Sequence, residues 1–183
     1  MKIGIIVGSV RDGRKGRKVG DWVLARARAH GGADHTLIDL KDFDLPLLTA
    51  AVNPAAAKRR YDDPRVTAWS EAIDPCDAFV FVTAEYNHSI PGAFKNAVDS
   101  LAPEWQRKAV AFVSYGSVGG VRAVEHWRGV VANFSMVAIR PQVTFFTFEE
   151  FDDAGAFAPH DRREGELATL LDALHDAARR TRE

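Results

Sequence analysis

The sequence predicts an α/β fold in which a five-stranded parallel sheet is covered by helices on both faces. Two observations predict this class. Short apolar segments rich in β-branched and aromatic residues alternate with amphipathic segments along the whole chain, and polar, glycine-containing turns follow three of them. The length of 183 residues and a hydrophobic fraction of 46% suit one domain with a sizeable core, which we expect to span residues 1–183.

The segments expected to form strands are short and apolar, as is typical of parallel strands that are buried on both faces. The first reads Lys-Ile-Gly-Ile-Ile-Val and the third reads Ala-Phe-Val-Phe-Val-Thr. Pro141 interrupts the last segment, so we expect that strand at a sheet edge or with a bulge. In chain order, we expect strands at residues 2–7, 35–40, 78–83, 108–115 and 136–145.

The intervening segments carry helical patterns and helix-end signals. The first places Val19, Val23 and Ala27 on one face, and the pair Gly31-Gly32 ends it. Pro64 is suited to the first turn of the second helix. In chain order, we expect helices at residues 17–29, 64–73, 91–101, 121–134 and 163–181, with an irregular loop at residues 42–53.

Strands that alternate with helices imply right-handed crossovers, and their number and spacing fit the flavodoxin-like strand order 2-1-3-4-5, a three-layer sandwich. In this order three loops meet at the carboxyl edge of the sheet, namely residues 8–16, 84–92 and 115–120. Open α/β sheets bind their ligands at this edge. These loops are also the richest in glycine and polar side chains, so we expect the functional site there.

The composition argues against several function classes. The chain has 24 basic and 25 acidic residues, a net charge of −1, which is unlike a nucleic-acid binder or a polybasic membrane surface. Cys76 is the one cysteine, so we expect no disulfide and no thiolate metal site. We find no signal-peptide pattern and no apolar run of about 18 residues, so we expect a cytoplasmic protein.

The first loop, residues 8–16, suits a phosphate group. Its glycines allow tight curvature, and the helix that follows offers free N–H groups and a positive dipole end. Ser9 adds a hydroxyl, and Arg11, Arg14 and Lys15 add positive charge. The Walker and dinucleotide glycine patterns are both absent. The alternative is a solvated basic turn, in which Arg14 and Lys15 act only as screening charges.

The other two loops suit a flat ligand with polar edges, such as an isoalloxazine ring. Backbone N–H groups around Glu85 and Asn87 supply donors, and Tyr86 supplies an aromatic wall. The glycines of residues 115–120 let the backbone approach a planar ligand closely. Glu85 has two interpretations: it fixes the loop or a subunit contact, or it acts as a general acid. Flavin chemistry needs no such acid, which favours the first.

Two motifs resemble those of a known family. Residues 8–11 (Gly-Ser-Val-Arg) look like a G-S-x-R phosphate loop, and residues 84–97 are similar to the signature P-E-Y-N-x-S-x-P-G-x-L-K-N-A. Together they resemble the NADPH-dependent FMN reductase-like family, whose members include chromate, quinone and azo-dye reductases. The resemblance covers about residues 2–145. Two departures from it matter: Ala84 replaces the usual proline, and Arg14 stands where many members have serine.

The resemblance implies bound FMN, with NADPH or NADH as co-substrate. It places the phosphate on Ser9, Arg11 and the helix start, and the ring beside the second and third loops. The cofactor-binding residues that we expect are Ser9, Arg11, Arg14, Lys15, Gly16, Arg17, Glu85, Tyr86, Asn87, Gly116, Ser117, Gly119 and Gly120. We expect no metal and no catalytic acid or base.

The implied function is an oxidoreductase that passes hydride from NAD(P)H to FMN and then to a quinone, free flavin, azo compound or metal oxyanion. The alternatives are a flavodoxin-like electron carrier and a flavin-binding regulatory protein. The resemblance also implies a homodimer or homotetramer whose partners are small-molecule acceptors, with no nucleic acid and no membrane. The sequence leaves open the physiological acceptor, the choice between NADPH and NADH, and the role of Arg14.

Overall fold

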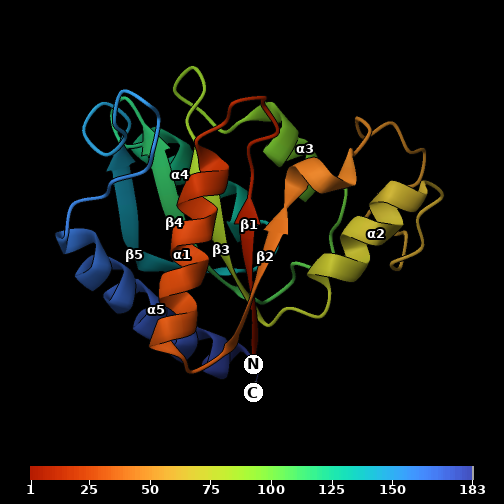
Figure 1. Cartoon of the computed structure of the whole chain (residues 1–183). Coiled ribbons are helices and arrows are strands. Elements are labelled where there is room, and N and C mark those ends of the chain that lie inside the picture. Colours follow the sequence, from red (N-terminus) through yellow and green to blue (C-terminus); the bar gives the residue numbers. More distant parts are fainter. Residues whose placement is uncertain (183) are drawn as a thin grey trace.

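The five strands are parallel and follow the predicted order β2-β1-β3-β4-β5 (Figure 1). The computed structural model describes residues 1–182. The strands lie close to their predicted bounds and are β1 Lys2–Val7, β2 Asp34–Asp39, β3 Ala78–Ala84, β4 Ala109–Gly116 and β5 Val137–Phe146. The flavodoxin-like topology predicted from the sequence is therefore confirmed.

Helices cover both faces of the sheet, with α1 and α5 on one face and α2, α3 and α4 on the other (Figure 1). A 3₁₀-helix, η1, directly follows β2 and lies partly in the segment predicted to be irregular. The helices are α1 Gly16–His30, η1 Leu40–Phe43, α2 Pro64–Ile73, α3 Gly92–Asp99, α4 Val121–Ala132 and α5 Arg162–Thr181. Within residues 1–182, none of these helices combines the length and the apolar character that a membrane crossing requires.

Two hydrophobic cores hold the layers together, because successive side chains of a strand point to opposite faces. In β3, Val80 packs in the core under α1 and α5, whereas Phe81 packs in the core under α2 to α4. The ring centre of Phe81 lies 4.9 Å from that of Phe94 and 5.2 Å from that of Trp127. The aromatic residues of this second core thereby fix α3 and α4 beside the carboxyl end of β3.

The edge strand β5 contains the irregularity that Pro141 predicted. Its register against β4 shifts between Val110 and Phe112, opposite the segment that includes Pro141. The guanidinium of Arg128, on α4, donates to the carbonyl oxygen of Ile139 at 2.8 Å. An arginine therefore binds a carbonyl group in the irregular part of the strand.

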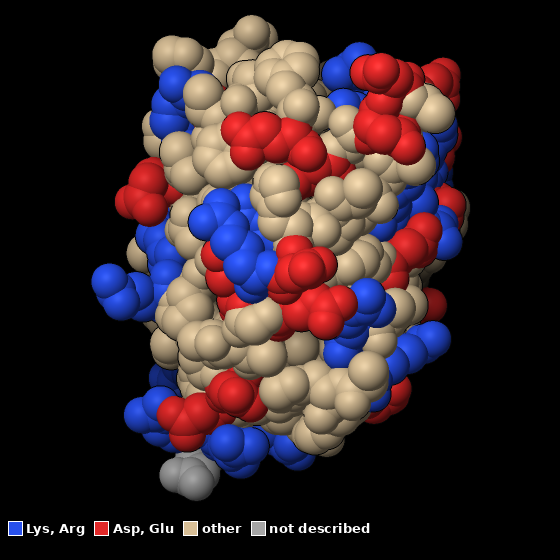
Figure 2. Space-filling view, turned by 60° about the vertical axis from the view of Figure 1, so that its left-hand side comes forward, with Lys and Arg blue, Asp and Glu red and all other residues tan. Residues whose placement is uncertain are grey.

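The surface carries interspersed charges. Figure 2 shows acidic and basic side chains mixed over the face that it presents. Ion pairs such as Arg26 with Glu164, at 2.8 Å between the nearest atoms, link α1 to α5. Arg163 and Glu150 form a buried pair with 2.7 Å between Nε and Oε1, which ties the segment after β5 to α5.

Three histidines lie close together: His30 on α1, His35 on β2 and His175 on α5. His35, on β2, is 2% exposed, and its Nε2 lies 3.4 Å from Nε2 of His175 on α5. The Nδ1 atom of His35 is buried without a hydrogen-bond partner among the described residues. Burial, and then the neighbouring His175, lower the pKa of His35 to about 4. The ring is therefore neutral in the folded protein at neutral pH.

The burial of His35 predicts a pH-dependent stability. Between about pH 6.5 and pH 4, the unfolded chain binds a proton that the folded chain excludes, so this residue's contribution to the free energy of unfolding falls as the pH falls. Relative to His35→Leu, the wild type should lose on the order of 3 kcal/mol across this window. Urea unfolding of both proteins at a series of pH values measures the difference, and a constant difference would contradict the assignment.

Candidate functional site

A cavity of about 300 Å³ opens at the carboxyl edge of the sheet, where the three polar loops meet as the strand order predicts. We name these the β1–α1 loop (residues 8–15), the β3–α3 loop (residues 85–91) and the β4–α4 loop (residues 117–120). The cavity is lined by Ser9, Arg11, Gly13, Arg14, Lys15, Ala84, Glu85, Tyr86, Tyr115, Gly116 and Thr147. Seven of the predicted site residues are in this set.

A larger cavity, of about 450 Å³, lies elsewhere, beside the irregular segment that follows η1. Its lining is mainly apolar and includes Leu47, Val52 and Tyr61. None of the predicted site residues lines this cavity, and no residue of the loops that follow β1, β3 and β4 does so. The polar cavity is therefore the candidate site.

The amino terminus of α1 is open to an anion. None of the described residues accepts a hydrogen bond from the backbone N–H groups of residues 9–17. The first turn of α1 contains no acidic residue, and no side chain caps the helix. Free N–H groups and the positive end of the helix dipole favour an anion such as a phosphate.

The amino terminus of α4 lies at the same edge but already has an acidic partner. The Oε2 atom of Glu85 accepts a hydrogen bond from the backbone N–H of Arg122 at 3.1 Å, and Oε1 accepts from Nε of Arg122 at 2.6 Å. The carboxylate thus binds both the helix start and a guanidinium. This geometry supports the interpretation in which Glu85 fixes the loop.

Tyr86 lines the cavity and lies in a tight turn. Tyr86 and Ser89 exchange two backbone hydrogen bonds of 3.0 Å, while Asn87 and His88 between them have positive φ values of 49° and 67°. The Tyr86 hydroxyl lies 3.1 Å from Oγ of Ser9. Two of the predicted loops therefore meet through their side chains.

Tyr115 is a cavity residue that the sequence did not single out as a site residue. A Cβ atom at Gly16 would lie 2.4 Å from the Tyr115 hydroxyl, so the absence of a side chain at Gly16 brings α1 against this ring. Burial raises the pKa of Tyr115 well above its usual range, so the hydroxyl stays protonated. It can therefore serve as a hydrogen-bond donor at the cavity wall.

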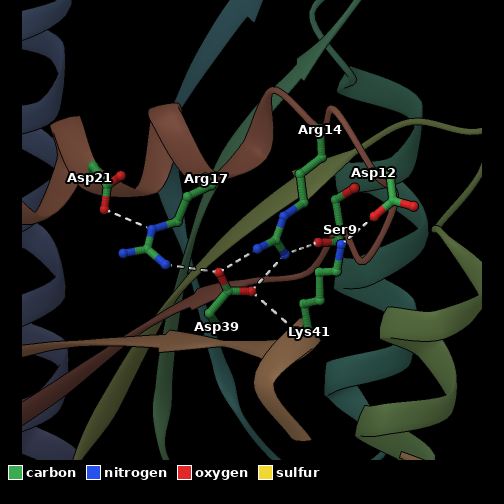
Figure 3. Close-up of polar contacts among 7 residues, drawn as sticks. All are labelled: Ser9, Asp12, Arg14, Arg17, Asp21, Asp39 and Lys41. Atoms are coloured by element: carbon green, nitrogen blue, oxygen red, sulfur yellow. Dashed lines mark hydrogen bonds and ion pairs between the residues drawn. The ribbon is translucent and has the colours of Figure 1, made fainter. Parts of the chain in front are cut away.

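Two of the predicted cationic contacts are engaged by carboxylates (Figure 3). Arg14 donates to both oxygens of Asp39, each at 2.6 Å. Arg17 pairs with Asp21 at 2.9 Å and with Asp39 at 3.2 Å, and it does not line the cavity. Both guanidinium groups thus bind Asp39, which follows Arg14 by 25 residues and reaches it only in the folded sheet.

Arg11 and Lys15 are the cationic residues of the cavity without a carboxylate partner among residues 1–182. The guanidinium of Arg11 lies 5.8 Å from the centre of the Tyr86 ring. Nζ of Lys15 donates to the carbonyl oxygen of Thr147 at 3.2 Å. Both groups leave positive charge at the edge where the amino terminus of α1 is open.

The remaining predicted residues lie beside the cavity and do not line it; they are Gly16, Arg17, Asn87, Ser117, Gly119 and Gly120. Asn87 and Ser117 are exposed, while Gly119 and Gly120 have positive φ values of 77° and 73° and shape the β4–α4 loop. Thr147, which lines the cavity, had no signal in the sequence. Its N–H donates to the carbonyl oxygen of Gly116 at 3.0 Å, which brings it to the site.

Among the described residues, no group of three or more histidine, cysteine, aspartate or glutamate side chains has a geometry that could hold a metal ion.

The family profile described as "NADPH-dependent FMN reductase" matches residues 1–150. The chain belongs to this family. At the level of the family, this confirms the predicted class, an oxidoreductase that uses FMN and NAD(P)H. The predicted resemblance of the two sequence motifs is confirmed as well.

Individual relatives have related names. An NAD(P)H-dependent FMN reductase of Nectria sp is 40% identical over 67% of this chain, and the match spans 63% of that protein. A 2-hydroxy-1,4-benzoquinone reductase of Burkholderia sp is 30% identical over 94% of this chain and 93% of that protein. FerB, a flavoenzyme NAD(P)H:(acceptor) oxidoreductase from Paracoccus denitrificans, has the same fold, with a TM-score of 0.77, 22% identity and 98% of each chain covered.

The edge of the site depends on a close approach at Gly8. Its N–H donates to the carbonyl oxygen of Val82 at 3.0 Å, and a Cβ atom there would lie 1.9 Å from Cδ1 of Phe94. Phe94 is fully buried and packed against Trp127, so its ring has little room to move. Glycine at this position lets the β1–α1 loop start directly against α3.

We expect Gly8→Ala to destabilise the protein by about 2 kcal/mol or more, because the new methyl group forces Phe94 out of its packing. Gly129→Ala is the matched control, since a Cβ atom there meets nothing within 4 Å. That change should leave stability unaltered or raise it by up to about 1 kcal/mol, because alanine favours the helix. Equal midpoints of chemical unfolding for the two variants would refute this account of Gly8.

Proposed function

We propose that the polar cavity binds FMN, with the phosphate at the start of α1 and the isoalloxazine ring against the turn that carries Tyr86. The observation that carries this proposal is the open amino terminus of α1, which faces a cavity whose wall is aromatic. The free N–H groups of residues 9–17, the Ser9 hydroxyl and the Arg11 guanidinium are the phosphate donors. Lys15 adds charge at longer range.

The ring has suitable partners in the other two loops. The backbone N–H groups of Asn87 and Ser117 have no acceptor among the described residues, so they are available to the polar edge of the ring. Gly116 allows close approach, and Tyr86 offers a flat surface. These contacts give Asn87 and Ser117 a role although their side chains do not line the cavity.

FMN, when bound, accepts hydride from NAD(P)H and transfers electrons to an acceptor. The chain's own residues bind and orient the reactants, and backbone N–H groups stabilise negative charge on the ring. We propose that no side chain acts as an acid or base. Glu85 is the acidic residue of the described cavity lining, and its carboxylate is held by Arg122.

A small quinone is the proposed acceptor. Support comes from the name of the Burkholderia relative, a 2-hydroxy-1,4-benzoquinone reductase whose length this chain matches almost completely. We further propose that residues 1–183 form one FMN-binding domain that works in the cytoplasm as a homodimer or homotetramer. Exposed apolar side chains at Leu47, Leu48 and Val52 are available for such a contact.

The visible absorption spectrum tests the proposed function. Purified protein that has been incubated with FMN and desalted should retain a flavin spectrum, and NADPH or NADH should bleach it without oxygen. Steady-state oxidation of the nucleotide with 1,4-benzoquinone should follow. A protein that retains FMN but shows almost no turnover without a partner reductase would instead be an electron carrier. Colourless protein after this treatment would exclude the FMN site.

We expect Arg11→Ala to weaken FMN binding about 10- to 100-fold, because one charge-assisted contact to the phosphate is lost. Turnover of the fraction that retains FMN should change far less, since Arg11 takes no part in electron transfer. Fluorescence titration of FMN measures the affinity. Arg140→Ala, which removes an exposed arginine on β5 outside the cavity lining, is the control and should bind FMN normally. Unchanged affinity in Arg11→Ala would contradict the phosphate assignment.

A further inference from the structure

Asp39 is a buried carboxylate beside the β1–α1 loop that does not line the cavity. It is the last residue of β2 and pairs in register with Val7, the last residue of β1. Only 4% of Asp39 is exposed. A carboxylate at this depth is unfavourable unless it is paired and hydrogen-bonded. Its partners therefore reveal what this position does.

Arg14 is the principal partner of Asp39 (Figure 3). Its two terminal nitrogens donate to the two carboxylate oxygens at 2.6 Å each, and Nη1 also donates to the carbonyl oxygen of Ser9 at 2.5 Å. A two-pronged pair of this kind fixes the orientation of the guanidinium as well as its position. Asp39 thus holds Arg14 in the place where it binds the backbone at Ser9.

The bond to Ser9 fixes the direction of a peptide group. All described peptide bonds are trans, and in a trans peptide the carbonyl and the following N–H point in opposite directions. Because the Ser9 carbonyl faces Arg14, the N–H of Val10 points away from Arg14. It belongs to the run of N–H groups without an acceptor.

A second set of contacts links the same loop to Asp39 through Lys41. Nζ of Lys41 pairs with Asp12 at 2.5 Å, and the backbone N–H of Lys41 donates to Asp39 at 3.1 Å. Asp12, Arg14 and the Ser9 carbonyl are therefore all linked to the end of β2 (Figure 3). Asp39 and Lys41, to which the loop is linked, do not line the cavity.

We propose that Asp39 is a positioning residue for the cofactor: through Arg14 it holds the β1–α1 loop in the conformation that binds the FMN phosphate. This inference rests on the proposed function. Asp39 does not touch the cofactor, and Arg14 serves the phosphate through the backbone at Ser9. Arg14 stands where many family members have serine, and in this chain it links Asp39 to the loop.

The direction in which Asp39→Asn changes FMN affinity distinguishes a positioning role of Asp39 from a purely electrostatic effect of its charge. Removing a negative charge close to an anion site would strengthen FMN binding by Coulomb's law. Loss of loop positioning would weaken it instead, and we expect an increase in the FMN dissociation constant of about 10-fold or more. Riboflavin has the same ring without the phosphate, so its dissociation constant should change by less than about three-fold.

The role of Arg14 is tested with a double-mutant cycle. If Asp39 acts through Arg14, adding Asp39→Asn to Arg14→Ser should weaken FMN binding less than about three-fold further. Arg14→Lys keeps the charge but loses the pair of hydrogen bonds to the two Asp39 oxygens, so it should weaken FMN binding as Asp39→Asn does. Asp21→Asn is the matched control, because Asp21 pairs with Arg17 and not with Arg14. It should bind FMN normally.

The FMN and riboflavin affinities of these variants decide whether Asp39 positions the loop. Weaker FMN binding with nearly unchanged riboflavin binding supports the proposal. Unchanged or tighter FMN binding, or equal loss of FMN and riboflavin, overturns it. Should Asp39→Asn fail to fold in a thermal melt, Arg14→Lys gives the same decision. If the wild-type protein binds neither ligand, the FMN site itself is refuted. If the wild type binds FMN and the variants bind it with the same affinity, only the role of Asp39 is refuted.

Discussion

The parallel direction of all five strands is the constraint on which the site depends. Parallel strands place all their carboxyl ends at one edge, and the strand order sets β1 directly beside β3. The loops after these strands therefore meet although about 70 residues separate them in the chain. Burial on both faces enforces this arrangement, because each strand contributes alternate side chains to two cores. The cavity follows from the packing of the sheet.

The two helices that start beside the cavity differ in how their amino termini are satisfied. In α4, Glu85 binds the N–H of Arg122 and neutralises the end of the helix. In α1, no side chain caps the helix and no acidic residue occupies the first turn. An anionic ligand therefore gains more at α1 than at α4. This difference explains why a phosphate is expected beside Ser9 and a neutral ring system beside Glu85.

Local patterns in the sequence predicted the elements, their order and the meeting of the three loops. They predicted less well which side chains share the cavity. Arg14 was predicted as a cofactor-binding residue or a screening charge, and its pairing with Asp39 was not predicted, because Asp39 lies on another strand and only the register of β1 with β2 brings the two together. Thr147 reaches the site through a backbone bond to Gly116, which no residue type reveals. Contacts between distant segments depend on register, and register is a property of the whole sheet.

Two acid–arginine pairs stabilise two of the loops that line the cavity. Glu85 with Arg122 links the β3–α3 loop to α4, and Asp39 with Arg14 links the β1–α1 loop to β2. In both pairs the carboxylate is largely shielded from solvent, so each pair is screened less than a surface ion pair. Loops that are ordered in advance lose less conformational entropy when a ligand binds. The chain therefore places its buried charges where they hold the backbone, and leaves backbone N–H groups and Arg11 to meet the ligand.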